Sequence, residues 1–171
     1  MKLSELNAIP THFDRYINLC DDIEITHAIK KSIEEMDHFP IEKWNEIGDK
    51  TYAEGKWTIK EIIQHLIDTE RVFSYRALAF SRKEKQSLPT FSEDEYSNAS
   101  NANSRTLESL LDELKAVHYS FLFLYQSFSD DQLNTLGKTY FGEYSVASIG
   151  FFMPGHQKWH LRVIEEKYMN L

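Results

Sequence analysis

The sequence has few residues that would cross-link or interrupt a fold: one cysteine, six glycines and four prolines among 171 residues. Cys20 has no second cysteine to pair with, which excludes an internal disulfide and is typical of a reducing compartment. The scarcity of glycine and proline suits helices with well-defined ends. The first residues lack the apolar run of a signal peptide. We therefore expect a cytoplasmic protein.

Positive charge is also scarce. The chain carries 19 lysines and arginines against 27 aspartates and glutamates, a net charge of −8, and no basic stripe. A nucleic acid or an anionic membrane surface is therefore not an expected partner. No stretch approaches the roughly 18 apolar residues of a membrane span. We expect a soluble protein.

Apolar residues make up 42% of the chain and aromatic residues 13%, enough for a real core in one domain over residues 1–171. Apolar residues recur every three or four positions in four stretches, which predicts four amphipathic helices. We expect helices in residues 21–39, 57–80 and 104–128, and a last one that Ser145 caps. The predicted fold is all-α, an up-and-down four-helix bundle. Residues 137–144 are the one place where a short strand could occur.

The first of these helices can be capped by Asp21 or Asp22. The second has a stronger start, because Thr58 and Glu61 have the spacing of a capping box. Between the second and third helices, residues 81–103 form a long polar connection broken by Pro89. Connections of this length are often functional or mobile, so this one is either a plain crossover or a lid.

The last helix contains His156 and His160, which lie one turn apart on one face and within its apolar stripe. Burying two unpaired imidazoles is costly, and one shared metal ion satisfies both. The alternative is two core histidines, each bonded to a carbonyl or carboxylate. Gly150, Pro154 and Gly155 are expected to bend the helix just before this pair.

Three other polar residues fall on or beside apolar stripes. His65 lies on the flank of the second helix's stripe, and Glu70 lies inside it, where a carboxylate needs a ring N–H or an arginine as partner. His118 lies in the stripe of the third helix, where a lone histidine is more often a satisfied core residue than a ligand.

His65 with His156 and His160 would make a neutral three-nitrogen site on two helices. Three protein ligands leave one coordination position open, as in catalytic metal sites. Imidazole nitrogens suit zinc, nickel, cobalt or iron. Ligand rings need partners for their outer N–H groups, and Glu70 is the first candidate near His65.

The chain resembles the DinB/YfiT-like family of metal-binding four-helix bundles over nearly its whole length. The resemblance is carried by Tyr16-Ile17, the run from Gly55 to Glu70, Pro89-Thr90-Phe91, Asn103-Ser104-Arg105 and His156-Gln157-Lys158-Trp159-His160. It implies that His65, His156 and His160 are the ligands of a divalent metal ion. It also implies a metal-dependent hydrolase, or a thiol S-transferase that uses bacillithiol, mycothiol or glutathione.

Three functions stay open at this point. A hydrolase would use the ion to activate water, with Glu70 or His118 as candidate general base. An S-transferase would activate a low-molecular-weight thiol, whose carboxylates Arg71, Arg76 or Arg82 could hold, although solvated surface arginines are the simpler interpretation of all three. A non-catalytic binding module would be favoured if His118 closed the site as a fourth ligand. A homodimer is a further expectation.

Overall fold

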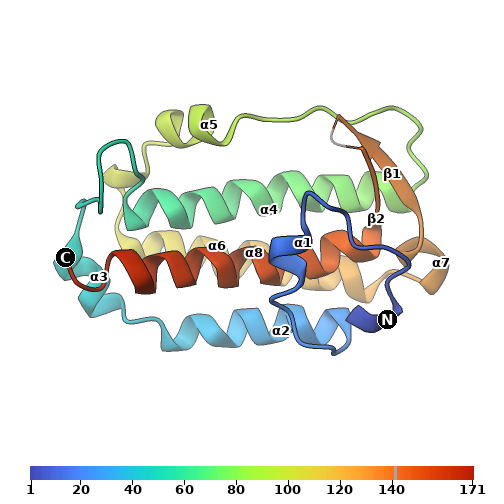
Figure 1. Ribbon diagram of the computed structural model, residues 1–171, viewed down its shortest axis with the longest axis horizontal. Coiled ribbons are helices and arrows are strands. Elements are labelled where there is room, and N and C mark those ends of the chain that lie inside the picture. The colour runs from blue at the N-terminus through green and yellow to red at the C-terminus, as the bar shows by residue number, and fades with distance from the viewer. Residues whose placement is uncertain (141) are drawn as a thin grey trace.

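The computed structural model describes residues 1–140 and 142–171, and four long helices dominate it (Figure 1). They are α2 (Ile25–Glu35), α4 (Ile59–Ser81), α6 (Leu107–Gln126) and α8 (Val146–Lys167). Each packs against two of the others: α4 and α2 each lie against both α6 and α8. The predicted all-α four-helix bundle is confirmed.

The chain directions refine the up-and-down description. Figure 1 shows α2 and α8 running one way and α4 and α6 the other. Side-chain contacts between α4 and α6 agree with this. Near the start of both helices Arg105 donates to Gln64, and further along both helices Glu70 contacts His118. Direction alternates from α2 to α4 and from α6 to α8. The long connection between α4 and α6 returns the chain to its starting end, so these two helices are parallel.

Short elements join the long helices. They are η1 (Leu3–Glu5), α1 (Asp14–Ile17), η2 (Met36–His38), α3 (Ile41–Ile47), α5 (Glu93–Ala99), η3 (Ala102–Ser104), α7 (Asp130–Leu133), β1 (Leu136–Thr139) and β2 (Gly142–Ser145). The strand expected within residues 137–144 is present as an antiparallel hairpin of β1 and β2, with residue 141 outside the described part. None of the described helices is long and apolar enough to cross a membrane.

Local capping explains where two of the long helices begin. Thr58 Oγ1 accepts from the Glu61 amide at 3.1 Å, and the Glu61 carboxylate accepts from the Thr58 amide at 2.7 Å, so the capping box is confirmed. Ser145 caps α8 as expected. The cap expected at Asp21 or Asp22 is wrong, because α2 begins later, after Glu24. Asp21 instead pairs with Lys31, and Asp22 accepts from the Ser4 amide.

The core consists of two apolar clusters separated along the bundle by a polar layer. One cluster, around Phe73, Phe121 and Phe152, fills the end near the hairpin, and the other, around Ile63, Leu110 and Ile164, fills the end near α3. The layer between them, called the middle layer below, contains Ser32, His65, Thr69, Glu70, His118, His156, Gln157 and His160. All of these except the partly exposed His160 are buried. Buried polar residues from all four long helices therefore meet at this level of the bundle.

Gly155 lets the short helix α1 lie directly on α8 at this level. A Cβ at residue 155 would come within 2.2 Å of the Tyr16 carbonyl oxygen, so only glycine permits the backbone of α1 to approach this closely. The contact brings the Tyr16 ring against that of His156, with centroids 5.1 Å apart. The helix α8 continues through Pro154, so the proline does not end it.

Candidate metal centre

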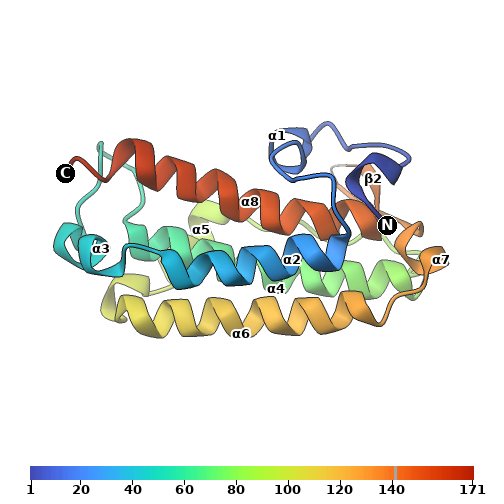
Figure 2. The ribbon, with the colours of Figure 1, turned by 90° about the horizontal axis from the view of Figure 1, so that it is seen from below.

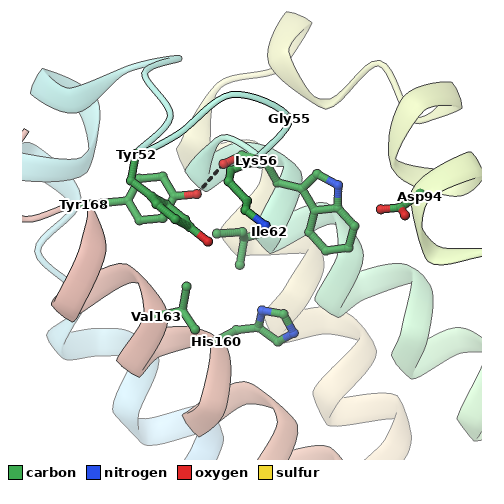
Figure 3. Close-up of a pocket in the computed structure, with 9 residues that line it drawn as sticks. Tyr52, Gly55, Lys56, Ile62, Asp94, His160, Val163 and Tyr168 are labelled. Carbon is green, nitrogen blue, oxygen red and sulfur yellow. Dashed lines mark hydrogen bonds between the residues drawn. The ribbon is translucent and has the colours of Figure 1, made fainter.

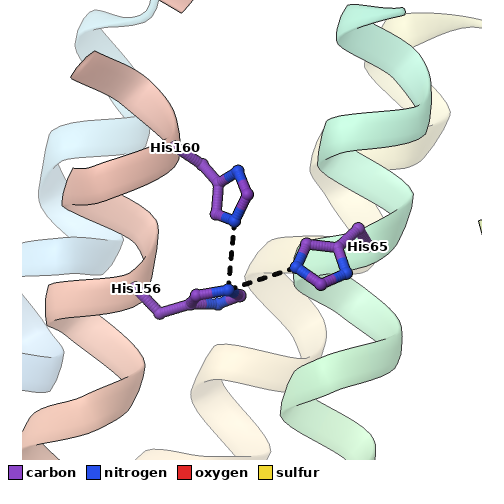
Figure 4. Close-up of side chains that lie close together, drawn as sticks. All are labelled: His65, His156 and His160. Carbon is purple, nitrogen blue, oxygen red and sulfur yellow. Dashed lines mark hydrogen bonds between the residues drawn. The ribbon is translucent and has the colours of Figure 1, made fainter. Parts of the chain in front are cut away.

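Three imidazole rings from two helices converge on one point in the middle layer (Figure 4). His65 comes from α4, and His156 and His160 from α8. Nε2 of His156 lies 3.1 Å from Nε2 of His65 and 3.1 Å from Nε2 of His160. All three ligand atoms lie within 4.8 Å of one another. Nitrogens bound to one tetrahedral zinc ion at about 2.0–2.1 Å would be about 3.3 Å apart, so the spacing fits a shared ion.

Burial keeps these rings in the form that binds metal. It lowers the pKa of His65 to about 3, with a smaller contribution from His160. It lowers the pKa of His160 to about 4, with Arg15 as the second cause. The pKa of His156 falls well below its ordinary value, again mainly through burial and then through the charges of His160, His65 and Arg15. The three imidazoles are therefore neutral at neutral pH, and a neutral ring nitrogen is a metal ligand.

Neighbouring groups fix the orientation of the rings. Thr69 Oγ1 lies 3.4 Å from Nδ1 of His65, and the Trp57 ring packs on the same imidazole with centroids 4.8 Å apart. Phe152 stacks on His156 at 5.1 Å, while Nδ1 of His156 has no hydrogen-bond partner within the described part of the chain. These contacts fix the rings of His65 and His156.

The partner of Glu70 in the structure is His118 and not His65. Its carboxylate contacts Nδ1 of His118 across the packing of α4 on α6, and both side chains are almost fully buried, at 0% and 2% exposure. We expected a buried Glu70 to have a ring N–H or an arginine as partner, and to orient a ligand histidine or a nearby arginine; its ring partner in the structure is His118, which is not one of the three proposed ligands. The reason is angular: five residues along a helix turn a side chain about 140° away from His65. His118 is not part of the histidine cluster, so among the described residues no fourth histidine closes the site.

Two cavities adjoin the cluster. The larger, of about 350 Å³, is lined by residues of α1, α4, α5 and α8, among them His156. The smaller, of about 240 Å³, is lined by His160 together with Tyr52, Trp57 and Tyr168 (Figure 3). Asp94 of α5 lines both cavities. Neither Glu70 nor His118 lines either one. Each cavity therefore has one of the three histidines in its wall.

Of the three arginines that were interpreted as solvated surface residues, two are exposed and one is buried. Arg71 pairs with Glu113 at 2.6 Å and Arg82 is exposed, as expected for surface arginines. Arg76 is only 3% exposed and lines the larger cavity, so its assignment to the solvated surface is wrong. Its place on α4 carried a signal, because it shares a helical line with His65 and Thr69.

Sequence reasoning also missed the cavity residues outside the long helices. Arg15 and Tyr16 come from α1, which has only four residues, and Asp94 comes from the connection after α4. Elements this short have no periodic pattern from which a buried face could be identified.

Comparison with known proteins gives consistent results. A family model described as the DinB superfamily matches residues 3–164. A protein of Oceanobacillus iheyensis named "Putative metal-dependent hydrolase" is 26% identical over 148 residues, which is 84% of this chain and 85% of the relative. The structure of YfiT from Bacillus subtilis, described as a probable metal-dependent hydrolase with an unusual four-helix bundle topology, superposes with a TM-score of 0.69. It covers 94% of this chain and 88% of YfiT at 15% identity, which supports the fold.

Proposed function

The chain belongs to the DinB superfamily, and from that premise we propose that it is a metal-dependent enzyme, a hydrolase, that acts on a small molecule. The proposed ligands of one divalent ion are His65, His156 and His160. The observation that carries the proposal is the convergence of three neutral Nε2 atoms at one buried point. The name of the Oceanobacillus relative supports the same chemistry.

The donor set fits a zinc or nickel ion with at least one position left for water or substrate. An ion held there would supply a Lewis acid and would lower the pKa of bound water toward about 7. The protein's own part is to hold the three rings neutral and oriented, through burial and through Trp57, Thr69 and Phe152. The rings of Trp57 and Phe152, which pack on His65 and His156, would shield a reacting group there from part of the bulk water.

Glu70 and His118 were the candidates for a general base, and that role stays a prediction. Neither lines the cavities beside the cluster. A base must come within hydrogen-bond reach of the proton that it removes, directly or through one water. We also propose that the contact between these two side chains fixes α4 against α6 at the level of the metal centre.

A second candidate function is thiol S-transfer, which one observation favours. A transferase must place a thiol and an electrophile at the same centre, and two separate cavities adjoin the cluster, one beside His160 and one beside His156. A low-molecular-weight thiol could occupy one of them. A non-catalytic binding module is less well supported, because His118 is paired with Glu70 and does not complete a four-histidine site.

Location, domain organisation, partners and oligomeric state complete the description of the enzyme. We propose a cytoplasmic protein, with residues 1–171 forming one domain, that has no nucleic-acid partner and forms a homodimer. Light scattering during size-exclusion chromatography would measure the oligomeric state, and a monomer at all micromolar concentrations would contradict the dimer.

The decisive experiment measures metal and activity together. Purified protein is analysed for bound zinc, nickel, cobalt and iron, and the metallated form is assayed with ester and amide substrates and with thiol plus electrophile. We expect about one ion per chain and one activity that disappears with a chelator and returns with the metal. A metallated protein inactive in both assays would favour the binding module.

A further inference from the structure

The guanidinium of Arg76 is buried without an anion. Its Nη2 donates to the carbonyl of Pro89 at 2.9 Å and its Nη1 to the hydroxyl of Tyr144 at 3.3 Å. Its Nε has no hydrogen-bond partner among the residues that the structure describes. The group lies over the Phe73 ring, 4.6 Å from the centroid. No described carboxylate lies within the 4.0 Å of an ion pair with it, whereas Arg71 on the same helix pairs with Glu113.

A buried guanidinium without a partner of opposite charge lowers the stability of the folded protein. Arginine stays protonated at any pH that a protein experiences, so it cannot lower the cost by losing its charge. Neutral acceptors satisfy some of its N–H groups but do not balance the charge, and a buried charge normally has a partner of opposite sign. Two of the five N–H donors have acceptors, so donors remain for one more partner.

The cavity beside Arg76 connects it with the metal centre. Arg76 and His156 both line the cavity of about 350 Å³. Between them the wall is aromatic: the His156 ring stacks on Phe152 at 5.1 Å, and Phe152 lies 4.5 Å from Phe73, over which Arg76 sits. A ligand in this cavity would have an apolar wall along its length and a fixed positive charge at one end.

The other charges of the cavity restrict the ligand further. Glu93 and Asp94 of α5 and Arg15 of α1 also line it. Burial and Asp94 raise the pKa of Glu93, while Arg15 opposes that rise. Arg15 is exposed and acts on Glu93 through its charge, whereas Arg76 is the buried cation of this cavity and has no described carboxylate within 4.0 Å. A second anion facing α5 would meet Glu93 and Asp94, so a ligand with a single anion fits best.

We propose that this cavity binds a monocarboxylate with an apolar body. Its carboxylate lies on the guanidinium of Arg76, its body crosses Phe73 and Phe152, and its other end points toward His156. The fork of a guanidinium matches a carboxylate with two parallel hydrogen bonds. The assignment of the reacting end rests on the proposed function, whereas recognition of the carboxylate by Arg76 does not.

The test compares two probes of equal shape, 4-phenylbutanoate and 4-phenylbutanamide, by calorimetric titration. Both are titrated first into protein freed of metal by a chelator, so that a carboxylate cannot bind an ion instead of Arg76. We expect the acid to bind at least about tenfold more tightly than the amide, since a charge-assisted pair contributes more than one factor of ten. Equal binding of the two probes to the metal-free wild type would overturn the proposal by itself.

Two variants locate the effect. Arg76→Gln should abolish the preference for the acid, and Arg76→Lys should retain part of it, because lysine keeps the charge but not the fork. The matched control is Arg82→Gln, which removes an exposed arginine just after α4 and should change nothing. Retention of the full preference in a folded Arg76→Gln variant would contradict the proposal.

Metal-loaded protein then separates this inference from the proposed function. If the preference for the acid persists without metal but no activity is found with metal, the anion site stands and the enzyme proposal fails. If the preference exists only with metal bound and does not respond to Arg76→Gln, the carboxylate binds the ion and the Arg76 site is refuted.

Discussion

Two groups of buried polar residues in the middle layer share helix α4 but have different kinds of partner. Glu70 and His118 contact each other as an acid–base pair across α4 and α6, and neither lines the two cavities beside the histidine cluster. The three histidines between α4 and α8 present their nitrogens to one point and are flanked by both cavities. An acid–base pair compensates itself, whereas three neutral acceptors that face one another need a cation from outside. The same layer therefore contains one closed structural pair and one site for a ligand.

The largest expected effect is the loss of bound metal when the histidine cluster, and not the Glu70–His118 pair, is changed. His156→Ala should remove nearly all bound metal, because His156 is the ligand whose Nε2 lies close to both other nitrogens. The control is His27→Ala, which removes an exposed histidine of α2. Elemental analysis after gel filtration measures the stoichiometry. One ion per chain in a folded His156→Ala variant would rule out the site.

Breaking the closed pair should cost stability and leave the metal in place. Glu70→Leu or His118→Leu alone leaves one polar group buried without its partner, which is expected to lower the free energy of unfolding by about 3–5 kcal/mol. The double variant should recover most of that loss, because it leaves no unpaired group. Urea denaturation and metal analysis are run on all three variants. A single variant that keeps wild-type stability but loses metal would show that Glu70 and His118 serve the metal centre after all.

Metal removal should lower stability without unfolding the chain, because the two apolar clusters do not depend on the ion. Binding to the folded state stabilises it by about 2.7 kcal/mol at a free metal concentration of 100 Kd. After chelation, circular dichroism should stay helical, with one cooperative thermal transition at a lower temperature. Unfolding by a chelator at room temperature would make the ion structural and would remove the main support for an enzyme.

The smallest expected effect is the acid sensitivity of the metal-free protein. The folded pKa of His65 is about 3, and that of an unfolded histidine about 6.5, so between these values the unfolded chain binds the extra proton. Stability is therefore full above about pH 6.5 and falls as the pH drops, by about 1 kcal/mol per pH unit for this residue. Denaturant titrations of wild type and His65→Leu between pH 7 and pH 5 measure the slope. An equal slope in both proteins would show that His65 does not contribute.

Much of this architecture follows from local patterns in the sequence. Apolar residues three and four positions apart identify α2, α4, α6 and α8, and the capping box at Thr58 sets the start of α4. The His156–His160 pair is also local, because positions i and i+4 share a helix face wherever the helix lies. Resemblance to the family added His65, which no local rule connects with α8.

Contacts between elements decided the rest. Glu70 lies in an apolar stripe, but only the parallel packing of α4 on α6 selects His118 as its partner instead of a metal ligand. Arg76 has a charged side chain, which is usually exposed to solvent. It is buried here because Pro89 and Tyr144, which lie outside α4, accept hydrogen bonds from its guanidinium. Periodicity reports which face of one helix is buried, and it contains no information about which neighbour covers that face. The sequence alone therefore determined the helices and the paired histidines, and the tertiary structure decided the partners, the cavities and the unbalanced arginine.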